Sequence, residues 1–141
     1  MLVEIESFLG IPYRYHRGPS EGELSLKDGI NCQAFVHIVY RECLGVQLPP
    51  SMRSSEIFED TELFEAIDSS KIPQFGDVYL FGRAGETNPR RFHLAVYVGN
   101  ENGEFCLAHA TKFGKQSLIW PLSRFHNNDC YERLYGIRRL K

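Results

Sequence analysis

Three features are missing from this 141-residue chain, and each absence excludes a class of protein. No stretch reaches the ~20 consecutive apolar residues that a membrane-spanning helix needs, so we expect no membrane span. The formal net charge is −2 and the pI is about 6.2, whereas nucleic-acid-binding domains carry a strong basic excess. We therefore expect no nucleic-acid partner. No internal repeat, low-complexity run or interdomain linker is visible, and the length predicts one domain over 1–141.

Cysteine pairs at metal-binding spacing are also missing. No two of the four cysteines form a C-x-x-C motif, which disfavours a zinc ribbon or a thioredoxin-like site. If one cysteine is reserved for chemistry, an odd number is left for pairing, so a complete disulfide framework is not expected. This usage favours a reducing compartment.

A secretion signal is not evident in residues 1–10, which carry acidic residues early and lack both a basic region and a continuous apolar segment. As written, the chain is expected in the cytoplasm, with export by another route left open.

The hydrophobic pattern predicts helices first and strands later. Helices are expected over 2–9, 32–44 and 54–67, the last one broken near 60–61, and Asn31 and Gly45 are good start and stop residues for the second. Strands are expected over 78–81, 93–98, 104–110, 118–122 and 131–140. This order predicts an α+β fold, an antiparallel sheet with helices packed on one side.

Cys32 stands where a polar, glycine-punctuated loop meets the second predicted helix. Backbone N–H groups and the helix dipole at such a position favour a thiolate, and can lower a cysteine pKa from ~8.5 to ~3.5–7.5. His93 and His109 lie downstream and could supply a base and a residue that orients it, as in Cys-His hydrolases.

The two histidines flank a strong hairpin signal over 99–103. If the loop is centred on Glu101, His93 lies directly opposite His109, with Cβ atoms ~4.5–5.5 Å apart. A slip of one residue would send the two side chains to opposite faces of the sheet.

Blocks along nearly the whole chain resemble the NlpC-type peptidoglycan hydrolases, papain-like cysteine peptidases of bacterial cell walls. Residues 29–36, G-I-N-C-Q-A-F-V, are similar to the family's G-I-D-C-S-G/A-F-V nucleophile motif. Four other blocks match family motifs in the same order. Residues 10–15 resemble the opening G-x-P-Y-x-Y, and residues 76–78 resemble the P-G-D-L motif that enters a strand. Residues 93–99 resemble the strand H-V-G-I-Y-x-G, and residues 107–110 resemble the strand F-I-H-A. Residues 136–139 resemble the family's closing strand.

The resemblance implies a papain-like fold and an enzyme that needs neither cofactor nor metal. It implies Cys32 as nucleophile, His93 as general base and His109 as the third, orienting residue. Tyr13, Asn31 and Gln33 fall at substrate-binding or oxyanion positions. The implied partner is a peptide or a peptidoglycan fragment.

Departures from the family pattern lie around the expected nucleophile. Asn31 replaces an aspartate whose charge can receive the free amine of a stem peptide in relatives, and Gln33 replaces a serine. The loop Pro19–Asp28 is longer than usual and is expected near the cleft. A changed substrate is therefore one hypothesis.

The sequence supports a first hypothesis and leaves others open. The first is amide hydrolysis in a peptidoglycan stem peptide, at the D-glutamyl–diamino-acid linkage, with a muramoyl–alanine amidase as a near variant. The others are an inactive papain-like module that binds a peptide or a partner protein in a phage-tail or secretion assembly, and an intracellular amidase or acyltransferase. A metal site made by Cys32, His93 and His109 is disfavoured, because zinc normally adds a fourth ligand or water and uses tighter pair spacing. The oligomeric state is left open.

Overall fold

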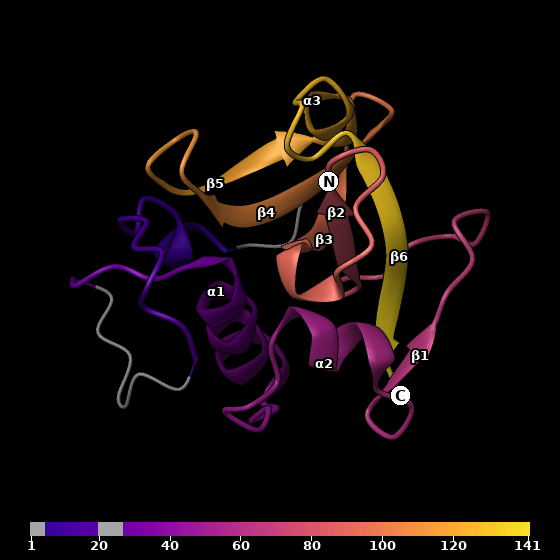
Figure 1. Cartoon of the computed structure of the whole chain (residues 1–141). Coiled ribbons are helices and arrows are strands. Elements are labelled where there is room, and N and C mark those ends of the chain that lie inside the picture. Colours follow the sequence, from indigo (N-terminus) through magenta and orange to yellow (C-terminus); the bar gives the residue numbers. More distant parts are fainter. Residues whose placement is uncertain (1–4, 20–26) are drawn as a thin grey trace.

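An antiparallel sheet of six strands, in the order β1-β6-β2-β3-β4-β5, forms the centre of the protein (Figure 1). The computed structural model describes residues 5–19 and 27–141. The helical elements are η1 (Glu6–Phe8), α1 (Cys32–Val39), η2 (Tyr40–Leu44), α2 (Ser54–Glu59), η3 (Pro89–Arg91) and α3 (Leu122–His126). The strands are β1 (Phe64–Ala66), β2 (Val78–Gly82), β3 (His93–Glu101), β4 (Glu104–Thr111), β5 (Gln116–Pro121) and β6 (Arg133–Leu140). The predicted α+β class is confirmed.

Alternation along the strands builds two apolar layers, one on each face of the sheet. Leu94 and Val96 of β3 pack with α1, while Ala95 and Tyr97 pack in a second cluster with Phe125 of α3. Figure 1 shows α1 and α2 on one side of the sheet and α3 on the other. The prediction that the N-terminal helices pack on the sheet is confirmed, whereas α3 on the opposite face was not predicted.

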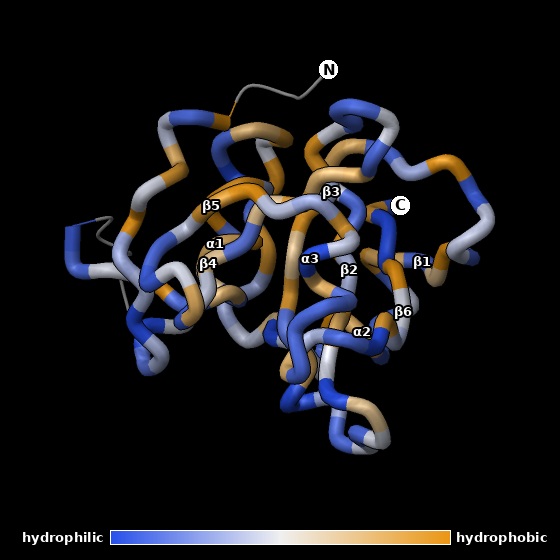
Figure 2. Tube along the Cα trace, turned by 90° about the horizontal axis from the view of Figure 1, so that it is seen from above, coloured by the Kyte–Doolittle hydropathy of each residue, from blue (hydrophilic) through white to orange (hydrophobic). Residues whose placement is uncertain are grey.

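Hydropathy along the chain follows the same layering. Figure 2 shows apolar residues along the central strands and hydrophilic residues in the outer turns. None of the helices in the described ranges is both long enough and apolar enough to span a bilayer.

The helix that begins at Cys32 forms as its local sequence predicts. The side-chain carbonyl of Asn31 accepts a hydrogen bond from the N–H of Ala34 at 2.9 Å, which caps the first turn. The last turn widens into the π-helical segment η2, and Gly45, with φ of +67°, ends it. The expected boundaries of 32 and 44 are confirmed.

The helix expected over 54–67 is wrong in its second half. The Asp60 carboxylate accepts hydrogen bonds from the N–H groups of Leu63 and Phe64, at 2.7 and 2.9 Å, and turns the chain out of α2. Phe64 then pairs with Leu140 as part of β1. Tertiary pairing overrides the local apolar spacing here.

The remaining boundaries differ at the ends of elements. In the first expected helix, the described residues form only the 3₁₀ turn η1, and residues 2–4 lie outside the described ranges. Leu122, expected to end a strand, begins α3. Residues 20–26 of the long Pro19–Asp28 loop also lie outside the description, so the expected position of that loop near the cleft stays a prediction.

The hairpin between β3 and β4 has a different register from the one expected. Its turn is Asn102-Gly103, both with positive φ, and not a loop centred on Glu101. A bulge lies between Tyr97 and Gly99, and on the side of the bulge away from the turn Val96 lies opposite Ala108. Extending this register places His109 opposite Ala95, so His93 and His109 are diagonal neighbours on one face. The prediction of direct opposition is wrong, and the prediction of a shared face is correct.

Candidate active site

Cys32 opens onto a cavity of about 980 Å³, whose walls come from the starts of α1, α2 and β3 and from the turns around them. His93 lines the same cavity, as do Tyr13, Asn31 and Gln33. His109 does not reach the cavity surface and lies behind His93, fully buried. The sequence-predicted site residues therefore gather in one region of the fold.

The Cys32 sulfur is held against the start of β3. Backbone N–H groups of Leu94, Cys32 and Gln33 donate to it and favour its ionised form. Burial outweighs these N–H groups and raises the pKa of the Cys32 thiol to about 11. The expected fall in the Cys32 pKa is therefore wrong, because desolvation of the sulfur exceeds the effect of the helix start.

His93 and His109 are in direct contact. His93 Nε2 lies 2.7 Å from His109 Nδ1, which leaves His93 Nδ1 as the ring nitrogen free to act on a neighbour. The His93 ring stacks on Tyr131 with centroids 4.0 Å apart and planes at 13°. Burial, with a smaller contribution from Lys112, lowers the pKa of His93 to about 3. His93 is thus neutral at pH 7 and fixed in orientation.

His109 sits among aromatic rings. Its ring centroid lies 4.6 Å from that of Trp120 and 4.5 Å from that of Phe125. His109 Nε2 is buried without a hydrogen-bond partner in the described part of the chain. Burial, then the neighbouring His93, holds the pKa of His109 well below its usual value.

Sequence reasoning missed the aromatic residues Trp120, Phe125 and Tyr131 that surround the two histidines. They come from β5, from α3 and from the segment before β6, so no local pattern joins them. Tyr131 is fixed in turn by a 2.8 Å hydrogen bond between its hydroxyl and that of Thr111, near His109 on β4. The available signal was that Trp120 and Tyr131 each lie on a predicted strand.

Tyr13 is brought to Cys32 by pairing of its own segment. Tyr13 forms a parallel bridge with Ile30, and the N–H of Ile30 donates to Pro12 O at 2.9 Å. Burial, and then the nearby Cys32, raise the pKa of Tyr13 to about 12. The phenol is consequently a hydrogen-bond donor at any physiological pH.

Asn31 and Gln33 are both committed to internal hydrogen bonds. Besides its capping bond, Asn31 donates from Nδ2 to Tyr15 O at 3.1 Å. Gln33 donates from Nε2 to Ser54 Oγ at 2.9 Å and accepts from Arg53 at 3.2 Å. These two side chains tie the start of α1 to the cavity walls, and their expected contact with substrate stays a prediction.

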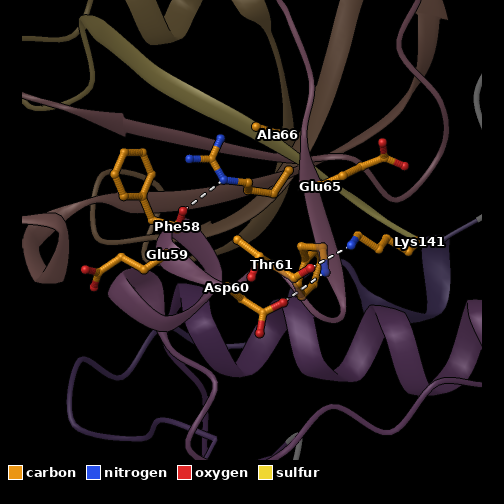
Figure 3. Close-up of a pocket in the computed structure, with 9 residues that line it drawn as sticks. Phe58, Glu59, Asp60, Thr61, Glu65, Ala66 and Lys141 are labelled. Carbon is orange, nitrogen blue, oxygen red and sulfur yellow. Dashed lines mark hydrogen bonds between the residues drawn. The ribbon is translucent and has the colours of Figure 1, made fainter.

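A second hollow, of about 320 Å³, lies between the end of α2 and β1 (Figure 3). Two of its polar side chains form local hydrogen bonds: Lys141 Nζ donates to Thr61 O at 2.6 Å, and Asp60 accepts from two backbone N–H groups. Arg138 lies over the Phe58 ring and donates to Phe58 O. No cysteine or histidine is among the described residues that line this hollow. Within residues 5–19 and 27–141, no group of three or more His, Cys, Asp or Glu side chains could hold a metal ion.

Comparison with known proteins identifies the family. The sequence model of the NlpC/P60 family matches residues 10–135. The chain belongs to the NlpC/P60 family. Its fold resembles the crystal structure of the NlpC/p60 domain of the peptidoglycan hydrolase SagA, with a TM-score of 0.57 over 96% of this chain and 92% of that one, at 18% identity.

Curated relatives cover a smaller part of the chain. The murein DD-endopeptidase MepS/murein LD-carboxypeptidase of Escherichia coli strain K12 is 37% identical over 76 residues, and the protein of E. coli O157:H7 matches equally. The match spans 54% of this chain and about a third, 35%, of the relatives' length. The segment shared with these relatives is therefore about half of this chain.

Proposed function

We propose that this NlpC/P60 chain is a cysteine hydrolase that cleaves an amide bond in a peptidoglycan stem peptide. The observation that carries the proposal is the sharing of one cavity by the Cys32 sulfur and His93, with His109 bonded behind His93. Membership of the NlpC/P60 family and the murein-cleaving relatives support the substrate class. Within that class we propose the D-glutamyl–diamino-acid linkage, with the muramoyl–alanine amide as the near variant.

The first chemical step transfers a proton as the carbon–sulfur bond forms. The Cys32 thiol and the His93 imidazole are both neutral at pH 7, because burial raises the pKa of the first and lowers that of the second. His93 Nδ1 takes the thiol proton while sulfur attacks the carbonyl carbon. The Tyr13 hydroxyl and the backbone N–H of Cys32 are the donors that we assign to the developing oxyanion.

The second half of the reaction returns that proton. The imidazolium of His93 protonates the leaving amine, and the acyl group stays on Cys32 as a thioester. His93 then accepts a proton from water, whose hydroxide attacks the thioester, and the released Cys32 sulfur takes the proton back. Atoms and charges balance without a cofactor.

The aromatic surroundings of His109 support a particular proton arrangement. An N–H directed at aromatic rings is weakly favourable, whereas a bare nitrogen lone pair is repelled by their negative faces. We therefore assign the proton of His109 to Nε2, which makes Nδ1 an acceptor. His93 then donates from Nε2 and keeps the lone pair of Nδ1 for Cys32.

Digestion of purified muropeptides, followed by mass spectrometry, tests the function. We expect wild type to release a new amine and a new carboxylate at one amide, and Cys32→Ser to release neither. The matched control is Cys43→Ser, which removes a partly buried thiol outside the cavity and should leave the product unchanged. Absence of product from wild type, or equal product from Cys32→Ser, contradicts the proposal and favours a binding module.

Substitution of His109 tests its orienting role separately. His109→Asn keeps an acceptor close to the Nδ1 position and should retain kcat within about tenfold, whereas His109→Leu removes the acceptor and should lower kcat about 10²–10⁴-fold. Steady-state kinetics over pH 5–9 measure the difference. Equal losses in the two variants would show that His109 acts only through packing.

A further inference from the structure

The cavity at Cys32 carries a charge opposite to that of the chain. Among the residues that the structure describes, five Lys and Arg side chains and two Glu side chains line it, a net charge of +3 within a chain of −2. The five cations are Arg53, Arg83, Arg90, Arg91 and Lys112. A concave site lined by one sign of charge concentrates ligands of the other sign.

These cations approach Cys32 from three separate segments. Arg53 precedes α2 and contacts Gln33, the residue after the nucleophile. Arg90 and Arg91 form η3, directly before β3, and Lys112 lies in the turn after β4. Lys112 is close enough to His93 to lower the pKa of that imidazole. Positive charge therefore lies close to His93 and beside Gln33, the residue that follows the nucleophile.

Both acidic side chains that line the cavity within residues 5–19 and 27–141 accept local hydrogen bonds. Glu56 accepts from the N–H of Arg53 at 3.0 Å, and Glu86 accepts from the N–H groups of Thr87 and Asn88, both at 3.1 Å. In contrast, no ion pair within the described ranges involves Arg83, Arg90, Arg91 or Lys112. Most of the positive charge thus remains available to a ligand.

The segment that carries Arg83, Arg90 and Arg91 is fixed before a ligand arrives. The Tyr135 hydroxyl donates to Arg83 O and accepts from the N–H of Glu86. Asn88 caps η3 by accepting from the N–H of Arg90 at 3.1 Å. Such preorganisation of the backbone reduces the entropy lost when the segment binds a ligand.

Asn31 supplies no negative charge beside the nucleophile. Its carbonyl caps α1 and its amide donates to Tyr15 O, an arrangement that a carboxylate could not make because two oxygens would then meet. A carboxylate would keep the cap and lose the hydrogen bond to Tyr15 O, so the local hydrogen bonds favour the neutral amide. A substrate amine therefore finds no carboxylate at this position.

Building on the proposed function, we propose that the cavity selects peptides that carry free carboxylates close to the scissile amide. Arg53, Arg91 and Lys112 are the specificity-determining contacts, and guanidinium groups suit carboxylates because they donate two parallel hydrogen bonds. A stem peptide offers such carboxylates at its D-glutamyl and diamino-acid residues. The amidated form of the same peptide should be a poor ligand.

Calorimetric titration of Cys32→Ser with a matched pair of stem peptides tests this preference without turnover. One peptide has free carboxylates and the other has the same groups amidated. We expect the free acid to bind about tenfold more tightly at low ionic strength, with the advantage shrinking as salt screens the charges. Equal affinity for the two peptides, or binding of neither, overturns the inference.

Charge-removing variants assign the preference to the cavity. Introduced with Cys32→Ser, Lys112→Gln and Arg91→Gln should each reduce the ratio of the two affinities several-fold, since both side chains are exposed on the cavity rim. Lys71→Gln, an exposed lysine outside the cavity, is the matched control and should leave the ratio unchanged. An unchanged ratio in both cavity variants overturns the inference. Failure of the proposed function can be distinguished from failure of this inference. If only the proposed function fails, Cys32-dependent cleavage is absent while the preference for the free acid persists.

Discussion

At the scale of single residues, burial controls the protons of Cys32 and His93 more than any charged neighbour does. Desolvation is the largest cause of the raised pKa of Cys32 and of the lowered pKa of His93. Both shifts favour neutral forms, so the resting protein holds a thiol beside an imidazole and not a thiolate–imidazolium pair. The position of Cys32 was predictable from its motif, but its proton affinity depends on packing that the sequence does not encode locally.

Alkylation of Cys32 should follow this raised pKa. Iodoacetamide reacts with thiolate, so the rate at Cys32 should still be rising between pH 8 and 10, because its pKa is about 11. Time-resolved peptide mass spectrometry identifies the modified residue, and a short free-cysteine peptide, with a midpoint near ~8.5, is the reference. A rate at Cys32 that is already constant below pH 7 would indicate a preformed ion pair.

At the scale of elements, the approach to α1 depends on one glycine. Gly29 has φ of +89°, and a Cβ there would lie 2.4 Å from Arg14 Cγ and 2.8 Å from Pro12 O. This close approach allows the strand-like contact between Pro12 and Ile30 that brings Tyr13 to Cys32. The close backbone contact thus explains why a glycine occupies position 29 of the nucleophile motif.

Gly29→Ala should therefore destabilise the fold more than Gly45→Ala. Both glycines have positive φ, which costs a non-glycine residue roughly 1–2 kcal/mol, but nothing lies within 4 Å of a Cβ at Gly45. We expect Gly29→Ala to lower the free energy of unfolding by about 1 kcal/mol or more beyond the loss in Gly45→Ala, because overpacking typically costs ~1–3 kcal/mol. Urea unfolding of both variants measures the difference, and equal losses would show that the contact with Pro12 relaxes easily.

Elements with a strong local pattern were predictable, and those that depend on distant partners were not. The apolar spacing and the Asn31 cap predict α1, and short apolar runs separated by turn signals predict β2, β3 and β4. β1 has one buried residue in three, Phe64, and exists because it pairs with β6. The hairpin register was wrong because the turn falls at Asn102-Gly103 and not around Glu101. The bulge after Tyr97, which no local signal predicts, then shifts the pairing by one residue and puts His93 and His109 on the same face.

At the scale of the whole molecule, the site is formed by segments far apart in the chain. The cavity cations come from three such segments. The positive charge of the cleft was therefore not predictable from the net charge of −2, which is a sum over the whole chain. The aromatic surroundings of His109 likewise come from separate elements. The predicted single domain over 1–141 and the predicted cytoplasmic location stay predictions.

Acid should destabilise the whole fold through its buried histidines. His37, His93 and His109 are buried, and burial lowers the pKa of each. Below pH ~6.5 the unfolded chain binds protons that the folded chain does not, so stability is full above that pH and falls as pH decreases toward 3. Each histidine that is neutral in the folded chain and protonated in the unfolded chain lowers the free energy of unfolding by up to about 1.4 kcal/mol for each pH unit of acidification.

Urea unfolding at pH 7.0 and 5.5 measures this slope. His109→Asn should make it shallower, while His126→Gln, a substitution at an exposed position, should leave it unchanged. A wild-type stability that is the same at both pH values would contradict the account of the buried histidines.

The thioester on Cys32 is the central claim, and its direct detection is the most decisive measurement. Wild type mixed with a stem peptide, quenched in acid within milliseconds and digested should yield the Cys32 peptide heavier by the acyl part of the substrate. The adduct should be absent from Cys32→Ser. An adduct on another residue, or turnover that persists in Cys32→Ser, would contradict the account.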